Sequence, residues 1–195
     1  MARRTRPRRA TSIFATVGVD FNFDASASTD DETPGDLQVR WDWENDGEWD
    51  TNFASTLTAN HAYTAAGDHV VRTEVRDTEG LTDAAFFNAT ALPDAAVALT
   101  IYPTAPTLAP TGLRWFRAIG QDVYGNVMYN PDVAWSVTDP LAGTISASGV
   151  FTAGVEDGAY PGVILAESGS ATDTASVTIA WPYRFYLPLA PKGYH

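Results

Sequence analysis

An acidic segment around Gly47 has the side chains that a calcium loop needs. Asp42, Asp46 and Asp50 recur at every fourth position, and carboxylate oxygens with a glycine at a sharp turn are typical of Ca²⁺ loops. The spacing approaches the start of an EF-hand, but Phe53 stands where the twelfth position of an EF-hand has a glutamate. An EF-hand is therefore excluded. Two interpretations stay open: a calcium site at the three aspartates, or an acidic turn in which Asp42 accepts hydrogen bonds from backbone amides.

Tryptophan is the second residue type that could bind a ligand, because its flat ring stacks on a sugar. Trp41 and Trp43 share their alternation with Val39, which predicts that both are buried. Trp49 lies outside this alternation and is the candidate glycan contact. The others are Trp135, which alternates with two valines, and the unconstrained Trp115 and Trp181.

Signatures of catalysis are missing from the sequence. No Gly-x-Ser-x-Gly, His-Glu-x-x-His, phosphate loop or Gly-x-Gly-x-x-Gly stands in a suitable context. The chain has no cysteine, so disulfides, thiol nucleophiles and Cys-based metal sites are excluded. His61 and His69 are interpreted as strand residues with structural roles. The sequence therefore predicts a protein that is not an enzyme.

Alternating side chains predict β-strands along most of the chain. Val17, Val19, Phe21 and Phe23 alternate with small or polar residues, a period typical of strands with one buried face. Turns rich in glycine, proline and aspartate separate such runs about every 8–12 residues, which indicates a sandwich or barrel. The pattern restarts after Pro93. The sequence therefore predicts an all-β fold of two tandem sandwiches or barrels, and the family resemblances of the two halves imply that these are immunoglobulin-like β-sandwiches.

Four segments follow from this pattern. They are a basic disordered segment at 1–13, a first sandwich at 14–92, a second at 93–180, and a tail rich in proline and aromatic residues at 181–195. The basic start is similar to that of a secretory signal, but the apolar run behind it is short, diluted by polar residues and without a cleavage site. It is interpreted as a linker, so no export signal is visible.

This fold predicts that two further acidic loops meet. In an immunoglobulin-like sandwich the loops after the second and sixth strands lie at the same end. Those loops carry Asp30 and Asp31 in one case and Asp77 and Glu79 in the other. Like charges brought together favour a bound cation, so these four residues are the leading candidates for Ca²⁺ ligands. The alternative is an acidic surface that only keeps the protein soluble.

Charge and hydropathy argue against binding to nucleic acid and against a membrane span. The formal net charge is −12, and 5 of the 12 basic residues lie within the first ten positions, where no acidic residue stands. The rest of the chain is therefore strongly acidic and repels a phosphate backbone, so nucleic acid is not expected as a partner. No run of about 18 apolar residues occurs, so no membrane span is predicted.

The first half contains an ordered set of short motifs. They are residues 23–30, Trp41-Asp42-Trp43 followed by Asp46-Gly47, residues 61–67 and Val75-Arg76-Asp77. In these motifs it resembles a PKD (polycystic-kidney-disease) domain. The turn after the second tryptophan is one residue longer and more acidic than the family pattern. The resemblance implies a sandwich in an extracellular or cell-surface protein. Some PKD-like domains bind calcium, and Asp30 and Asp31 fall in the loop that would supply ligands.

The second half has a different set of motifs, Phe116-Arg117-Ala118, residues 133–137, residues 143–154 and residues 175–179. In these it resembles a bacterial immunoglobulin-like domain of the intimin and invasin type over about residues 95–180. Near the end, Tyr186-Leu187-Pro188-Leu189 is similar to a short element that closes many exported bacterial surface proteins.

Both resemblances imply an accessory role in a secreted or surface bacterial protein. The first functional hypothesis is a non-catalytic extracellular spacer, adhesion or protein-interaction module. The alternative is a carbohydrate- or polymer-binding accessory of a secreted hydrolase. The expected partners are an extracellular protein or polysaccharide and the neighbouring domains of a parent protein. Ca²⁺ is the only cofactor that the sequence suggests.

Overall fold

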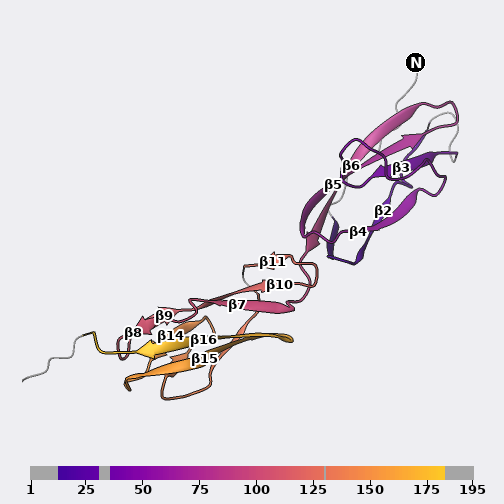
Figure 1. The fold of residues 1–195 in the computed structure, drawn as a ribbon. Coiled ribbons are helices and arrows are strands. Elements are labelled where there is room, and N and C mark those ends of the chain that lie inside the picture. Colours follow the sequence, from indigo (N-terminus) through magenta and orange to yellow (C-terminus); the bar gives the residue numbers. More distant parts are fainter. Residues whose placement is uncertain (1–12, 31–35, 130, 183–195) are drawn as a thin grey trace, which may run out of the picture. The chain divides into compact units, whose positions relative to one another are not determined.

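Alternation of apolar and polar side chains produces strands throughout the described part of the chain. The computed structural model describes residues 13–30, 36–129 and 131–182. Within these ranges it contains sixteen strands and no helix, so no helix there could cross a membrane. The chain divides into two compact units, Met1–Asp94 and Ala95–His195. The predicted all-β fold of two tandem immunoglobulin-like sandwiches is confirmed (Figure 1).

The first unit packs a four-stranded sheet against a two-stranded one. Its strands are β1 (Ile13–Thr16), β2 (Asp20–Asp24), β3 (Gln38–Asp42), β4 (Thr58–Ala62), β5 (Gly67–Arg76) and β6 (Thr82–Leu92). The sheets have the strand orders β1-β6-β5-β3 and β2-β4. The β1–β6 pair is parallel and the other pairs are antiparallel. Strand β3 therefore lies at an edge of the larger sheet.

Aromatic rings fill the core of the first unit. The Phe23 ring is fully buried, with its centroid 5.9 Å from that of Trp41, 5.2 Å from that of Trp43 and 5.9 Å from that of Phe87. Trp41 and Trp43 are buried as their alternation predicts, and their rings are stacked 5.4 Å apart. The Tyr63 hydroxyl donates a 3.0 Å hydrogen bond to the Trp43 backbone carbonyl. The one polar atom of the buried Tyr63 side chain therefore has a partner.

The second unit has ten strands in two layers. They are β7 (Ala98–Tyr102), β8 (Thr107–Leu108), β9 (Leu113–Trp115), β10 (Arg117–Gln121), β11 (Val127–Met128), β12 (Ala134–Val137), β13 (Gly143–Ile145), β14 (Val150–Ala153), β15 (Gly158–Ser168) and β16 (Ala171–Ile179). One sheet has the order β12-β15-β16-β8, and the facing strands pair as β13-β14-β9 and β11-β10-β7.

One stretch of chain changes its pairing partner at Phe116. Strand β9 pairs with β14, whereas β10, one residue later, pairs with β7. Phe116 is buried between them, and its N–H donates a 2.8 Å hydrogen bond to the Gly149 carbonyl. Because side chains alternate along extended chain, burial of Phe116 turns Trp115 and Arg117 outward. Trp135, predicted to be buried, packs against the core but is only half-buried.

The predicted end segments lie almost entirely outside the described residues. Ile13 is the first described residue and begins β1, while Trp181 and Pro182 are the last. The basic segment before Ile13 and the Tyr186-Leu187-Pro188-Leu189 element therefore have no structural description.

Candidate functional site

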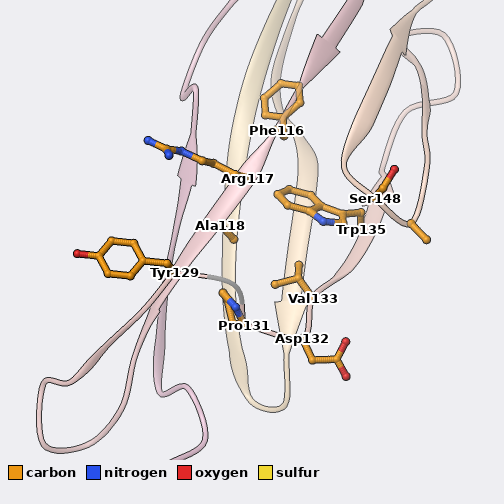
Figure 2. A pocket seen from close by; sticks show the side chains of 10 residues that line it. Phe116, Arg117, Ala118, Tyr129, Pro131, Asp132, Val133, Trp135 and Ser148 are labelled. Atoms are coloured by element: carbon orange, nitrogen blue, oxygen red, sulfur yellow. The ribbon is translucent and has the colours of Figure 1, made fainter. Parts of the chain in front are cut away.

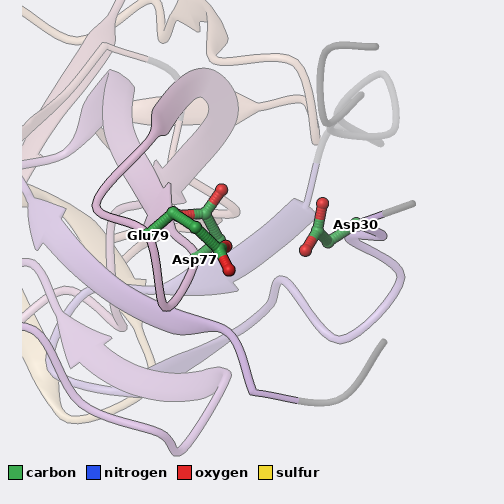
Figure 3. A group of neighbouring side chains, drawn as sticks. All are labelled: Asp30, Asp77 and Glu79. Atoms are coloured by element: carbon green, nitrogen blue, oxygen red, sulfur yellow. The ribbon is translucent and has the colours of Figure 1, made fainter. Parts of the chain in front are cut away.

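Three of the four leading calcium candidates come together at one end of the first unit. Asp30 lies in the connection between β2 and β3, and Asp77 and Glu79 follow β5. Carboxylate oxygens of these three residues all lie within 4.8 Å of one another. Figure 3 shows Asp30 facing the other two from the opposite loop. Asp31, the fourth candidate, lies outside the described residues. We call the three residues the acidic pole.

The turn after β5 holds Asp77 in place. Its backbone N–H donates to the Leu81 carbonyl at 3.1 Å, and its carboxylate accepts the Leu81 N–H at 2.8 Å. Gly80 takes a φ of 87°, a conformation that glycine adopts without strain. Asp77 is consequently buried while Glu79 stays exposed. Both line a surface groove of about 410 Å³ that also contains Asp36.

The spacing of these oxygens suits a hard cation. Ca²⁺ binds oxygen at about 2.4 Å, so two ligands of one ion lie at most about 4.8 Å apart. The acidic pole meets that limit, and water or further oxygens of the groove would complete the six to eight ligands that Ca²⁺ takes. Its donors are all carboxylates, which favours Ca²⁺ over softer metals.

The second candidate set, in the loop after β3, uses its carboxylates differently. Asp42 is fully buried, and its two oxygens accept the N–H groups of Asp46 and Gly47, each at 3.1 Å. Asp50 accepts the Trp43 N–H at 2.7 Å. Among the described residues, the acidic pole is the only set of three or more metal-binding side chains that meets the 4.8 Å limit. The geometry of Asp42 therefore matches the amide-capping interpretation.

The loop after β3 carries several carboxylates close to one another. Burial raises the pKa of Glu44, and the neighbouring charges of Asp50 and Asp46 raise it further. Asp46 itself accepts the Glu48 N–H at 2.9 Å. The loop after β3 is thus held by backbone-to-carboxylate hydrogen bonds despite its negative charge.

Trp49, the predicted glycan contact, packs against arginines. The guanidinium carbons of Arg40 and Arg72 lie 4.1 Å and 4.5 Å from the centre of its half-buried ring. Phe53 lies in the same way between Arg40 and Arg76, at 4.5 Å and 4.0 Å. A sugar would have to displace these cation–π contacts. The surroundings of Trp49 therefore favour a structural role.

Two hollows in the second unit were missed by sequence reasoning. One, the Trp115 notch, has a volume of about 460 Å³ and is lined by Tyr102, Pro103, Arg114, Trp115, Phe116 and Arg117. The other has about 280 Å³ and includes Arg117, Tyr129, Asp132 and Trp135 (Figure 2). The available signal was the run Arg114-Trp115-Phe116-Arg117, which holds all the basic residues between 95 and 182.

A stack of rings joins the core of the first unit to its surface. The Trp43 and His61 rings lie 4.7 Å apart and are nearly parallel, and the His61 ring lies 4.6 Å from that of Tyr63. Burial lowers the pKa of His61; nearby His69 acts in the same direction, while the charges of Asp50 and Asp20 oppose it. Burial also raises the pKa of the Tyr63 hydroxyl. Both side chains are therefore held in their neutral forms.

Comparisons with known proteins agree with this architecture. Residues 9–89 match the family model of the PKD domain, which covers less than half of the chain and describes its first unit. No catalytic family is indicated. A search of curated proteins found no match. The resemblance predicted from the first half of the sequence is therefore confirmed for that half.

Several solved structures are similar to this chain at low sequence identity. The human desmocollin-1 ectodomain is 11% identical, with a TM-score of 0.51, over 93% of this chain and 38% of that chain. Drosophila N-cadherin EC1-4 is 8% identical, with a TM-score of 0.49, over 89% and 47%. Domains 4 and 5 of the S-layer protein SbsC are 20% identical, with a TM-score of 0.41, over 57% and 65%. This chain spans less than two thirds of each of them.

Removing the buried carboxylate of Asp42 tests its capping role. Asp42→Ala leaves the Asp46 and Gly47 amides without their acceptor, so we expect the free energy of unfolding to fall by about 3 kcal/mol, since bonds to charged groups contribute about 1.5–3 kcal/mol each. Asp46→Ala, which removes one exposed bond, should cost about 1 kcal/mol or less. Urea unfolding followed by tryptophan fluorescence measures both. Equal losses would contradict the role given to Asp42.

The lowered pKa of His61 predicts a pH dependence of stability. A histidine with a folded pKa below its unfolded value near 6.5 binds fewer protons in the folded state, so stability falls as the pH drops below about 6.5. His61→Gln removes this linkage. We expect the unfolding free energy of the unmodified protein to fall more steeply between about pH 7 and about pH 5 than that of the variant. Parallel curves in urea titrations would show that His61 is not linked to folding.

Proposed function

We propose that the chain is a non-catalytic extracellular module that acts as a spacer, adhesion or protein-interaction element of a secreted or surface bacterial protein. The observation that carries this proposal is the tandem of two immunoglobulin-like sandwiches, of which the first matches the PKD domain. The likeness to the desmocollin-1 ectodomain supports the same architecture.

The interior polar groups support a structural role. In the part of the chain that the structure describes, every buried side-chain nitrogen or oxygen has a hydrogen-bond partner. Asp42 holds a loop, Tyr63 holds the Trp43 carbonyl, and Glu74 pairs with Arg40. These groups are engaged in the fold, whereas catalytic groups are aimed at a substrate.

Surface exposure can be tested directly. An antibody against residues 13–182 should label intact cells of the bacterium that produces the protein, and external protease should remove the label. A cytosolic enzyme of the same cells, probed in parallel, should stay unlabelled and uncut. Antigen that becomes accessible only after the cells are lysed would contradict the proposed location.

We further propose that residues 95–180 form an intimin/invasin-type domain and that the sandwiches are linked near residue 93. The pairing of β7 with β10 and the short parallel strand β8 beside β16 support this proposal. Neighbouring domains of a longer protein would then be the immediate partners of both units.

A calcium site at the acidic pole is the second part of the proposal. The convergence of Asp30, Asp77 and Glu79 supports it, as does the turn that fixes Asp77. A cation would neutralise the mutual repulsion of these carboxylates. Binding would tie the loop before β3 to the turn after β5, and so stabilise this end of the first unit.

Calcium should therefore raise the melting temperature. A free concentration of about 100 times the Kd stabilises by about 2.7 kcal/mol, and a unit of this size gains about 4–8 °C per kcal/mol. Asp30→Asn/Glu79→Gln should abolish the shift and leaves Asp77 to hold its turn. Calorimetry of samples treated with chelator and then given millimolar CaCl₂ measures it.

The matched control is Asp46→Asn/Glu48→Gln in the loop after β3, which removes the same charge. This variant should keep the full calcium response. An unchanged melting temperature of the unmodified protein, or a response lost equally in both double variants, would contradict a site at the acidic pole.

A further inference from the structure

All the positive charge of the described part of the second unit is gathered in one place. Between residues 95 and 182 the sequence has seven acidic residues and only two basic ones, Arg114 and Arg117. Both line the Trp115 notch and both are exposed. An otherwise acidic surface therefore carries one local cationic site, built around a tryptophan that is 69% exposed.

The fold explains why these side chains face solvent together. Burial of Phe116 between β9 and β10 turns its neighbours Trp115 and Arg117 outward. Arg117 is paired in register with Tyr102, the last residue of β7, and its guanidinium carbon lies 5.8 Å from the Tyr102 ring centre. The notch opens beside β9, where β7 has ended.

Two arginines of the first unit have polar partners. In the first unit Arg40 pairs with Glu74, and Arg76 donates to Gln38 at 2.6 Å. By contrast, the side chains of Arg114 and Arg117 have no ion pair or hydrogen bond among the described residues. Ten N–H donors, five on each guanidinium, are thus available to a ligand beside an open aromatic ring.

We propose that the Trp115 notch binds a polysaccharide that carries carboxylate groups, as a chain of uronic acids does. The apolar face of one sugar ring stacks on the Trp115 indole, and its carboxylate accepts hydrogen bonds from Arg114 or Arg117. Guanidinium groups match carboxylates in a two-bond geometry. A neutral glycan would leave both guanidiniums without a counter-charge.

A polymer fits better than a single sugar because the surface continues past Arg117. Arg117 also lines the neighbouring hollow, whose lining includes Tyr129, which is 71% exposed, and one carboxylate, that of Asp132 (Figure 2). Trp115 and Tyr129 therefore offer two exposed aromatic rings, and Arg117 lines both hollows. The overall charge of −12 opposes binding of any polyanion, but at about 0.15 M salt exposed charges more than about 8 Å apart are largely screened from one another.

This site is independent of the calcium site and of the proposed spacer role. Affinity electrophoresis at physiological salt would compare native gels that contain polygalacturonate with gels that contain its highly methyl-esterified form. The second polymer keeps the sugar rings and lacks most of the charge. We expect retardation by the first polymer only, with the apparent Kd raised at least about tenfold by Trp115→Ala, the loss typical of removing an anchoring aromatic side chain.

Charge is tested by Arg114→Gln/Arg117→Gln, which should raise the apparent Kd by a similar factor. The matched control is Arg72→Gln/Arg76→Gln, which removes two positive charges from the first unit and should leave retardation unchanged. Circular dichroism melts show whether each variant is folded.

Three outcomes would overturn the proposal. They are no retardation by polygalacturonate, equal retardation by the esterified polymer, or equal weakening in the control variant. Since none of them involves the acidic pole, failure here would leave the calcium proposal and the spacer role untouched.

Discussion

A carboxylate buried at the end of an edge strand organises much of the first unit. Strand β3 ends at Asp42, where the chain has to leave the sheet and return to the two-stranded layer at β4. Loop amides turned into the protein need acceptors, because an unpaired buried N–H costs about 1–3 kcal/mol. Asp42 supplies two of them from one side chain. A neutral side chain of similar size would offer only one oxygen as a hydrogen-bond acceptor, where Asp42 offers two.

The loop also directs the chain that follows it along the open edge of strand β3. An unpaired edge strand is a template for aggregation. The chain that follows the loop returns along β3, and Val39 exchanges 2.8 Å and 2.9 Å backbone hydrogen bonds with Ala54. Trp49 and Phe53 reach from this segment over the arginines of β3 and β5. Capping, edge protection and the arginine–aromatic contacts are therefore parts of one arrangement, which explains why a tryptophan outside the strand alternation is half-buried.

The fold could be predicted from strand alternation. The roles of particular side chains could not, because they depend on contacts between residues far apart in the sequence. Alternation placed Trp41 and Trp43 in the core, and the order of strands predicted that the loops carrying Asp30 and Asp77 would meet. The same residue types serve a calcium loop and an amide cap, so sequence left the role of Asp42 open. The neighbours of Trp49 come from strands 9 and 23 residues away, and no local pattern encodes such contacts. The sequence alone did not predict the exposure of Trp115. Trp115 faces solvent because the chain changes its strand-pairing partner at Phe116.

Arginine and aromatic residues are combined in two different ways in the two units, and the difference bears on function. In the first unit Arg40 has a carboxylate partner and an aromatic ring, so its charge and its hydrogen-bonding capacity are already engaged. Such an arginine stabilises the surface of the protein and has little charge or hydrogen-bonding capacity available for a ligand. Around the Trp115 notch Arg117 lies over the Tyr102 ring, but the side chains of Arg114 and Arg117 have no ion pair or hydrogen bond among the described residues. A single exposed apolar residue needs no explanation. Here, however, an exposed tryptophan lies beside the only two basic residues in an acidic stretch of 88 residues, which combines apolar area with positive charge. Such a combination is typical of recognition sites, where aromatic side chains and arginine supply most of the binding energy.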